Sequence, residues 1–255
     1  MFLETKDLVK KFDGVRAVDG LSIKIEPGKI TSIIGPNGSG KSTLVNALTG
    51  IIEIDGGMIY VRTSDVLTGT SDVKKLTKII PHQVPLLGIT RTFQDVRLFE
   101  QMTVLDNILV VLTERSVFGS LFVRPKSDSD SGRRKAKEVL EKVSLWEKRN
   151  QLAFNLSYGQ RKLLEIARVL AMDSNIILLD EPFAGLFPEM VKVVVSTIQH
   201  LKSSGKTIIL IEHNMDLIRE LSDYIFVMDS GKLLAEGLPN EVLTKRTVIE
   251  AYLGE

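Results

Sequence analysis

Residues 35–42 form a complete G-x-x-x-x-G-K-[ST] loop, which constrains the fold more than any other part of the chain. The stretch 31–34 before it predicts a strand, and residues 42–48 after it carry apolar side chains at helical spacing. A glycine-rich turn between a strand and a helix offers backbone N–H donors and a helix dipole to phosphate groups. In this setting we expect Lys41 to reach the β- and γ-phosphates of a nucleotide and Ser42 to bind Mg²⁺.

A pair of carboxylates follows a second apolar segment. Residues 176–179 are continuously apolar, as in strands buried on both faces of a parallel sheet, and Asp180 and Glu181 come directly after them. Ligands of open α/β sheets bind at the carboxyl ends of the strands. We therefore expect Asp180 to hold the Mg²⁺ shell and Glu181 to orient or deprotonate the water that attacks the phosphate.

The base of the nucleotide is less well specified by the sequence. The chain contains no N-K-x-D motif, which disfavours a guanine-nucleotide switch. Phe12, in a loop expected ahead of the strand at 31–34, is a candidate ring for stacking on adenine, with Val18 available to pad its edge. A place in the hydrophobic core is an equally good interpretation of a lone phenylalanine.

Composition limits the choice of partners. The net charge of +1 gives no electrostatic reason to expect nucleic acid or an anionic membrane surface, and the absence of cysteine excludes disulfides. Charged residues from Glu4 to Lys11 argue against a signal peptide, and no apolar run approaches the roughly 18 residues of a membrane span. A role at a membrane is therefore expected to require a partner protein.

The pattern of apolar residues changes along the chain. Residues 2–30 alternate apolar and polar positions and predict an antiparallel sheet, whereas the segment 207–211 predicts a further buried strand. From about residue 93 to 170, strand patterns give way to helical ones. Within this part, residues 126–134 predict an exposed polar loop, and the apolar stretch 117–123 fits either packed core or a docking surface.

A second strong helix begins with the sequence Leu-Ser-Tyr-Gly-Gln-Arg at residues 156–161. Its start is a second candidate anion site, serving either the same nucleotide or that of a partner subunit. Together with the phosphate loop and the acidic strand end, this sequence resembles the ATP-binding subunits of ABC transporters. In that family the signature sequence closes over ATP bound to the opposite subunit of a head-to-tail dimer.

The resemblance extends from Phe12 to Gly254 and implies further roles. Gln94 matches the Q-loop glutamine, which contacts Mg²⁺ and links the catalytic core to a helical subdomain, and His213 matches the switch histidine, which hydrogen-bonds the γ-phosphate. The implied catalytic residues are Glu181, His213 and Gln94. The implied metal ligands are Ser42, Gln94 and Asp180. The signature residues that are implied to act on the ATP of the other subunit, in trans, are Ser157, Tyr158, Gly159 and Gln160. The implied ATP contacts are Phe12, Val18, Gly35, Pro36, Asn37, Gly38, Ser39, Gly40, Lys41, Ser42 and Thr43.

The resemblance also implies the architecture. It is an α/β P-loop NTPase of the ABC ATPase type, with a mixed sheet core, an N-terminal antiparallel β subdomain and an inserted α-helical subdomain. Residues 1–255 are expected to form a single ABC ATPase domain. Within it, residues 1–92 and 171–255 are expected to form the catalytic core with the antiparallel β subdomain, and residues 93–170 the helical subdomain with the signature.

The match is closest to the LivG-like type, which serves the uptake of branched-chain amino acids. It rests on residues 88–94, 98–107, 235–237 and 248–254 and on the Leu-Ser-Tyr-Gly-Gln form of the signature. This implies an ATP-hydrolysing subunit that powers a membrane importer of branched-chain or other hydrophobic amino acids by ATP-driven dimerisation. Lipopolysaccharide export, urea uptake and a soluble ABC ATPase not linked to transport are the alternatives.

The same resemblance implies partners and a location. The cofactors are ATP and Mg²⁺, and the second ATPase of the dimer is either another copy or a related chain. The subunit is expected in the cytoplasm, held on the inner face of the cell membrane by membrane-spanning subunits. A substrate-binding protein is an indirect partner, and nucleic acid is not expected.

Two residues depart from the usual pattern of the family. Tyr158 stands where the first signature glycine is usual, as it does in the subfamily that this chain resembles. Phe187 stands in the D-loop, where related subunits carry Asp or Asn. Because a polar group there helps to couple the two ATP sites, Phe187 implies a coupling that is weaker or made differently.

Overall fold

The computed structural model describes residues 2–64, 71–76, 79–112 and 130–253. It divides the chain into two compact units. The first unit contains Met1–Arg91, Asn175–Glu181 and Gln199–Glu255, and the second contains Thr92–Ser174 and Pro182–Ile198. The apolar stretch 117–123 and residues 126–129 of the expected polar loop lie outside the described residues.

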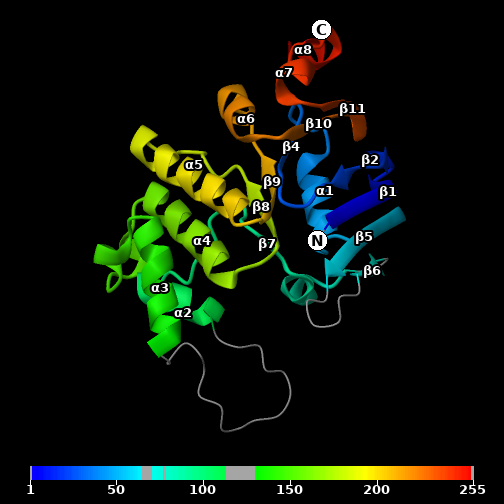
Figure 1. The fold of residues 1–255 in the computed structure, drawn as a ribbon. Coiled ribbons are helices and arrows are strands. Elements are labelled where there is room, and N and C mark those ends of the chain that lie inside the picture. Colours follow the sequence, from blue (N-terminus) through cyan, green and yellow to red (C-terminus); the bar gives the residue numbers. More distant parts are fainter. Residues whose placement is uncertain (1, 65–70, 77–78, 113–129, 254–255) are drawn as a thin grey trace. The chain divides into compact units, whose positions relative to one another are not determined.

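A six-stranded mixed sheet forms the centre of the first unit (Figure 1). Its strand order is β11-β10-β4-β9-β8-β7, and all neighbours are parallel except β10 and β11. The strands are β4 (Ile30–Ile34), β7 (Ile89–Arg91), β8 (Ile176–Asp180), β9 (Thr207–Ile211), β10 (Tyr224–Asp229) and β11 (Lys232–Gly237). Every residue of β4, β8 and β9 is buried, which explains their continuous apolar sequences and confirms the three strands expected there.

A second sheet in the same unit is antiparallel. Its order is β2-β1-β5-β6, and β3 pairs with β1. The strands are β1 (Phe2–Phe12), β2 (Val15–Leu21), β3 (Lys24–Ile25), β5 (Gly56–Ser64) and β6 (Ser71–Leu76). The antiparallel sheet expected for residues 2–30 is confirmed, and β5 and β6, which were not expected, extend it.

Two hydrophobic clusters hold the first unit together. One combines residues of both sheets with the buried face of α1 (Lys41–Leu48), including Leu3, Ile33, Leu44 and Ile209. The other packs Ile34 of β4 and alternate residues of β10, Ile225 and Val227, against the C-terminal helices. These helices are α6 (Met215–Leu221), α7 (Pro239–Val242) and α8 (Arg246–Leu253). The first unit also contains a 3₁₀ segment, η1 (Pro81–Leu87).

The second unit is helical, as the sequence patterns indicated for about residues 93–170. It contains α2 (Val104–Leu112), α3 (Asp130–Lys142), α4 (Tyr158–Met172), the part of α5 (Pro188–Ser203) up to Ile198, and the 3₁₀ segments η3 (Trp146–Lys148) and η4 (Ala153–Asn155). Helices α2, α3 and α4 contact one another (Figure 1). None of the helices in the described part of the chain combines the length and apolar character that a membrane span needs.

The prediction of a loop at 126–134 is wrong for residues 130–134, which form the first turns of α3. The misleading signal is the polar composition of a helix that buries only a narrow face, formed by Gly132, Ala136, Val139 and Leu140. The acidic side chain of Asp130 in the first turn is also favourable, because it interacts with the positive end of the helix dipole.

A buried ion pair fastens α4 to the chain segment around Gln94. Lys162 is fully buried, and its Nζ lies 3.9 Å from Glu165 Oε2 and donates to the carbonyls of Phe93 and Gln94 at 3.2 and 3.4 Å. Glu165 Oε1 accepts from Phe93 N at 3.0 Å. Burial raises the pKa of Glu165, while the hydrogen bond from Phe93 and the charge of Lys162 lower it in part.

This pairing predicts that Glu165→Ala destabilises the protein strongly. The substitution leaves the Lys162 ammonium buried without its carboxylate, which typically costs about 3–5 kcal/mol of unfolding free energy. Urea denaturation measures the loss. Glu141→Ala on α3 is the matched control, because it removes an exposed carboxylate 3.7 Å from Lys137 and should leave the denaturation midpoint nearly unchanged. Equal midpoints for the two variants would contradict the importance of the buried pair.

Candidate functional site

The phosphate loop lies between β4 and α1 and is packed against neighbouring backbone. Gly35 and Gly40 have φ values of 150° and 100°, in the region that favours glycine. A Cβ atom would lie 2.1 Å from the Met228 carbonyl oxygen at Gly35 and 2.3 Å from the Ala17 carbonyl oxygen at Gly40. At Gly38, with a φ of 80°, no atom lies within 4 Å of that position. The loop is therefore tightly supported at both ends and open at its tip.

Lys41 places a cation inside this loop. Its side chain is nearly buried, and Nζ donates to the carbonyl oxygens of Gly35 and Pro36 at 2.8 and 2.9 Å and to Ser39 Oγ at 3.4 Å. Burial lowers the pKa of the Lys41 ammonium, and the charges of Glu181 and Asp180 raise it in part. A cation with little access to water, surrounded by backbone groups, is suited to an anionic ligand that enters at the open tip.

Glu181 and His213 are brought together by adjacent parallel strands. Glu181 follows β8, and His213 follows β9 after Glu212. Glu181 Oε1 lies 2.9 Å from His213 Nε2, and Glu181 N donates to the carbonyl of Ile211 at 3.0 Å. The φ of Glu181 is 47°, an uncommon conformation for a residue with a side chain. This backbone conformation and the strand pairing hold the carboxylate beside the imidazole.

Asp180, the last residue of β8, is nearly buried and pairs with Arg91, for which no role was expected. The guanidinium of Arg91 donates to Asp180 Oδ2 at 3.1 Å and reaches Asn46 and Thr49 with its other terminal nitrogen. The available signal was a charged residue two positions after Ile89. That signal points to Asp180 only when β7 is known to pair with β8.

The two residues expected at the adenine differ in exposure. Phe12 is the last residue of β1 and does not lie in a loop, and 45% of its surface is exposed, so the core interpretation of this ring is wrong. Lys10 Nζ lies 5.2 Å from the centre of the ring. Val18 is fully buried in β2 and has no surface to offer a base in this structure. The exposed ring of Phe12 remains available for stacking.

The signature residues and Gln94 belong to the second unit. Ser157 caps α4: its hydroxyl accepts from Gln160 N, and the Gln160 side chain accepts from Ser157 N. A Cβ at Gly185 would lie 2.8 Å from the ring of Tyr158, so this ring lies against the turn that precedes α5. Gln94 is exposed.

Phe187 lies in the same turn before α5 and exposes 71% of its surface. It is therefore not a core residue of this chain. Covering an apolar side chain with this much exposed surface by a partner lowers the free energy.

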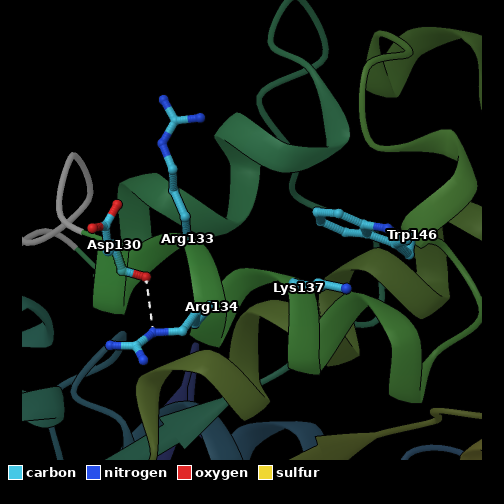
Figure 2. A pocket seen from close by; sticks show the side chains of 5 residues that line it. All are labelled: Asp130, Arg133, Arg134, Lys137 and Trp146. Carbon is cyan, nitrogen blue, oxygen red and sulfur yellow. Dashed lines mark hydrogen bonds between the residues drawn. The ribbon is translucent and has the colours of Figure 1, made fainter.

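The second unit also contains a hollow of about 530 Å³ on the surface of α3 (Figure 2). Asp130, Arg133, Arg134, Lys137 and Trp146 line it. Arg134 Nε donates to the Asp130 carbonyl at 3.3 Å, and Lys137 Nζ lies 5.6 Å from the centre of the Trp146 ring. No residue expected at the nucleotide lines this hollow.

The chain is similar to known proteins over nearly its whole length. Residues 18–184 match the family model described as ABC transporter. The chain is 38% identical over 259 residues to the high-affinity branched-chain amino acid transport ATP-binding protein BraF of Pseudomonas aeruginosa, covering 99% of this chain and 98% of BraF. It is 36% identical over 255 residues to the probable branched-chain amino acid transport ATP-binding protein LivG of Archaeoglobus fulgidus, covering 99% of this chain and 95% of LivG.

Solved structures give the same result. A nucleotide-free ATP-binding cassette from an ABC transporter superposes with a TM-score of 0.83 at 34% identity, covering 100% of this chain and 99% of that one. The ADP conformation of an ATP-binding cassette of an ABC transporter superposes with a TM-score of 0.82 at 35% identity, with the same coverage.

Proposed function

The chain belongs to the ABC transporter family, as one of its ATP-binding cassettes, and we propose that it hydrolyses ATP to power a membrane importer of branched-chain or other hydrophobic amino acids. The contact between Glu181 and His213 at the ends of β8 and β9, in the unit that holds the phosphate loop, carries the catalytic part of the proposal. The names of relatives matched over nearly their whole length support the substrate class.

Glu181 acts as the base in the proposed mechanism. Its carboxylate accepts the proton of the water that attacks the γ-phosphate, and His213 Nε2, 2.9 Å from Oε1, holds the carboxylate in place. The resemblance gives His213 a hydrogen bond to the γ-phosphate as well. Lys41 and the backbone N–H groups of the loop bind the phosphates.

Ser42 and Asp180 are the residues of the first unit proposed to hold Mg²⁺, and the resemblance implies the same role for Gln94. The described residues include no group of three or more His, Cys, Asp or Glu side chains that could hold a metal ion. One or two protein ligands are nevertheless sufficient for Mg²⁺ bound to a nucleotide, because phosphate oxygens and waters complete its coordination. When bound, the ion offsets the charge that develops on the phosphates.

The ATPase is proposed to work as a head-to-tail dimer. The N-terminus of α4 offers backbone N–H groups to an anion, and Ser157, Tyr158, Gly159 and Gln160 are proposed to contact ATP held by the other subunit. That subunit is a second copy or a related chain. Membrane-spanning subunits are proposed to hold the dimer on the inner face of the membrane, in a system that includes a substrate-binding protein.

Glu181→Gln is expected to keep ATP affinity and lose hydrolysis. The amide preserves the shape of the side chain but cannot take the proton, and loss of a general base typically lowers the rate by about 10²- to 10⁴-fold. Phosphate release and binding of a fluorescent ATP analogue measure the two effects. Glu220→Gln on the exposed side of α6 is the control and should hydrolyse ATP normally. Hydrolysis by Glu181→Gln within a few-fold of wild type would remove Glu181 from the mechanism.

Ser157→Asp tests the action of the signature in trans. Aspartate keeps the N-cap of α4, so the helix remains intact, but it places a negative charge where a phosphate is proposed to bind. We expect normal ATP binding by the monomer and loss of ATP-driven dimerisation, measured by size exclusion in the Glu181→Gln background. Ser157→Asn, which also keeps the cap, should dimerise better than Ser157→Asp. Equal dimerisation of the two variants would contradict a phosphate at this position.

Uptake by the host organism tests the purpose of the ATPase. Removal of this chain, together with any related ATPase of the same system, should abolish ATP-dependent uptake of leucine, isoleucine and valine. Restoring the wild-type chain should restore uptake, and the Glu181→Gln variant should not. Normal uptake of all three amino acids, with loss of urea uptake or of lipopolysaccharide export, would overturn the substrate assignment.

A further inference from the structure

Arg91 makes a three-way contact in the first unit. Its side chain is 9% exposed, Nη2 donates to Asp180 Oδ2 at 3.1 Å, and Nη1 donates to Asn46 Oδ1 at 2.8 Å and Thr49 Oγ1 at 3.0 Å. A guanidinium so far removed from water requires partners of this kind, because an unpaired buried charge is strongly unfavourable. The three contacts supply them.

The partners of Arg91 come from two elements of the proposed ATP site. Asn46 lies in α1, the helix that begins at the phosphate loop, and Thr49 is its C-cap. Thr49 Oγ1 donates to the Val45 carbonyl at 2.8 Å, so this hydroxyl is oriented to accept from Arg91. Asp180 ends β8, the strand next to β7. Arg91 therefore connects the far end of the phosphate-loop helix to the carboxylate proposed to bind the metal ion.

We propose that Arg91 is a positioning residue that fixes the direction of the Asp180 carboxylate for the metal ion of the bound nucleotide. This inference rests on the proposed ATPase function. Arg91 itself touches neither the nucleotide nor the metal ion in this proposal. It binds Oδ2 of Asp180, and its hydrogen bonds to Asn46 and Thr49 prevent the guanidinium from rotating. Partners of metal-binding carboxylates contribute to metal affinity in this way.

The geometry requires arginine and not merely a positive charge. The planar guanidinium presents donors in a rigid fork and can reach Asp180, Asn46 and Thr49 together. A lysine at the same position carries its charge on one ammonium group, which lacks this fixed fork. Charge and orientation can therefore be separated by substitution.

The test measures how much Mg²⁺ improves nucleotide binding. Affinity of the full chain for a fluorescent, non-hydrolysable ATP analogue is determined in excess Mg²⁺ and in EDTA, and the ratio of the two dissociation constants is the readout. In Arg91→Met we expect the affinity in EDTA to be retained and the improvement by Mg²⁺ to fall by about 10-fold or more. Arg91→Lys should show a similar loss, because charge alone does not restore the orientation.

Two further variants separate positioning from general destabilisation. Thr49→Val removes one acceptor of Arg91 but leaves Asp180 and its partner in place. It should therefore also reduce the improvement by Mg²⁺, but by less than Arg91→Met does. Lys202→Met is the matched control, because it removes a cation from an ion pair in the same unit, 2.6 Å from Asp223, outside the proposed ATP site. It should leave the ratio unchanged.

Several results would overturn the proposal. One is a ratio of the two dissociation constants that stays at the wild-type value in Arg91→Met, Arg91→Lys or Thr49→Val. Another is a loss of affinity by Arg91→Met in EDTA that is as large as its loss in Mg²⁺. Each of them leaves the proposed ATPase function standing if the wild-type chain binds and hydrolyses ATP. A wild-type chain that binds no nucleotide would overturn the proposed function, and the inference with it.

Discussion

Charged groups at the carboxyl edge of a buried parallel sheet must find partners among themselves, and the candidate site follows from this constraint. Strands β8 and β9 are buried at every residue, so a charge at their ends is only partly reached by water. Asp180 is paired with Arg91 from β7, and Glu181 lies against His213 after β9. Because strand order decides which ends are adjacent, the topology of the sheet selects these pairs.

The parts of the site that are contiguous in sequence could be predicted, and the pairings between distant parts could not. The phosphate loop and the acidic pair each combine a recognisable local motif with a flanking strand or helix, so their chemistry is visible in one short segment. The contact of Arg91 with Asp180 joins residues 89 positions apart and depends on β7 lying next to β8. His213 was found through the resemblance to a family, because a lone histidine after a strand has no distinctive local pattern.

The errors in the fold have the same origin. Residues 130–134 are polar because α3 buries only one narrow face, and polarity alone does not distinguish an exposed helix from a loop. Phe12 was placed in a loop, although it ends β1 opposite Val15. In both cases the side chains are compatible with several backbone conformations, and the pairing or packing with another element decides between them.

The same contacts lie where the chain leaves the first unit. The chain leaves the first unit after Arg91 and after Glu181, and it returns to that unit at Asn175 and at Gln199. On the first crossing, Arg91 is tied to Asp180, and only two residues later the backbone of Phe93 and Gln94 is held by Lys162 and Glu165 of α4. Each end of this short connection is therefore fixed by side chains of its own unit: Arg91 by Asp180 in the first unit and Phe93 by Glu165 in the second.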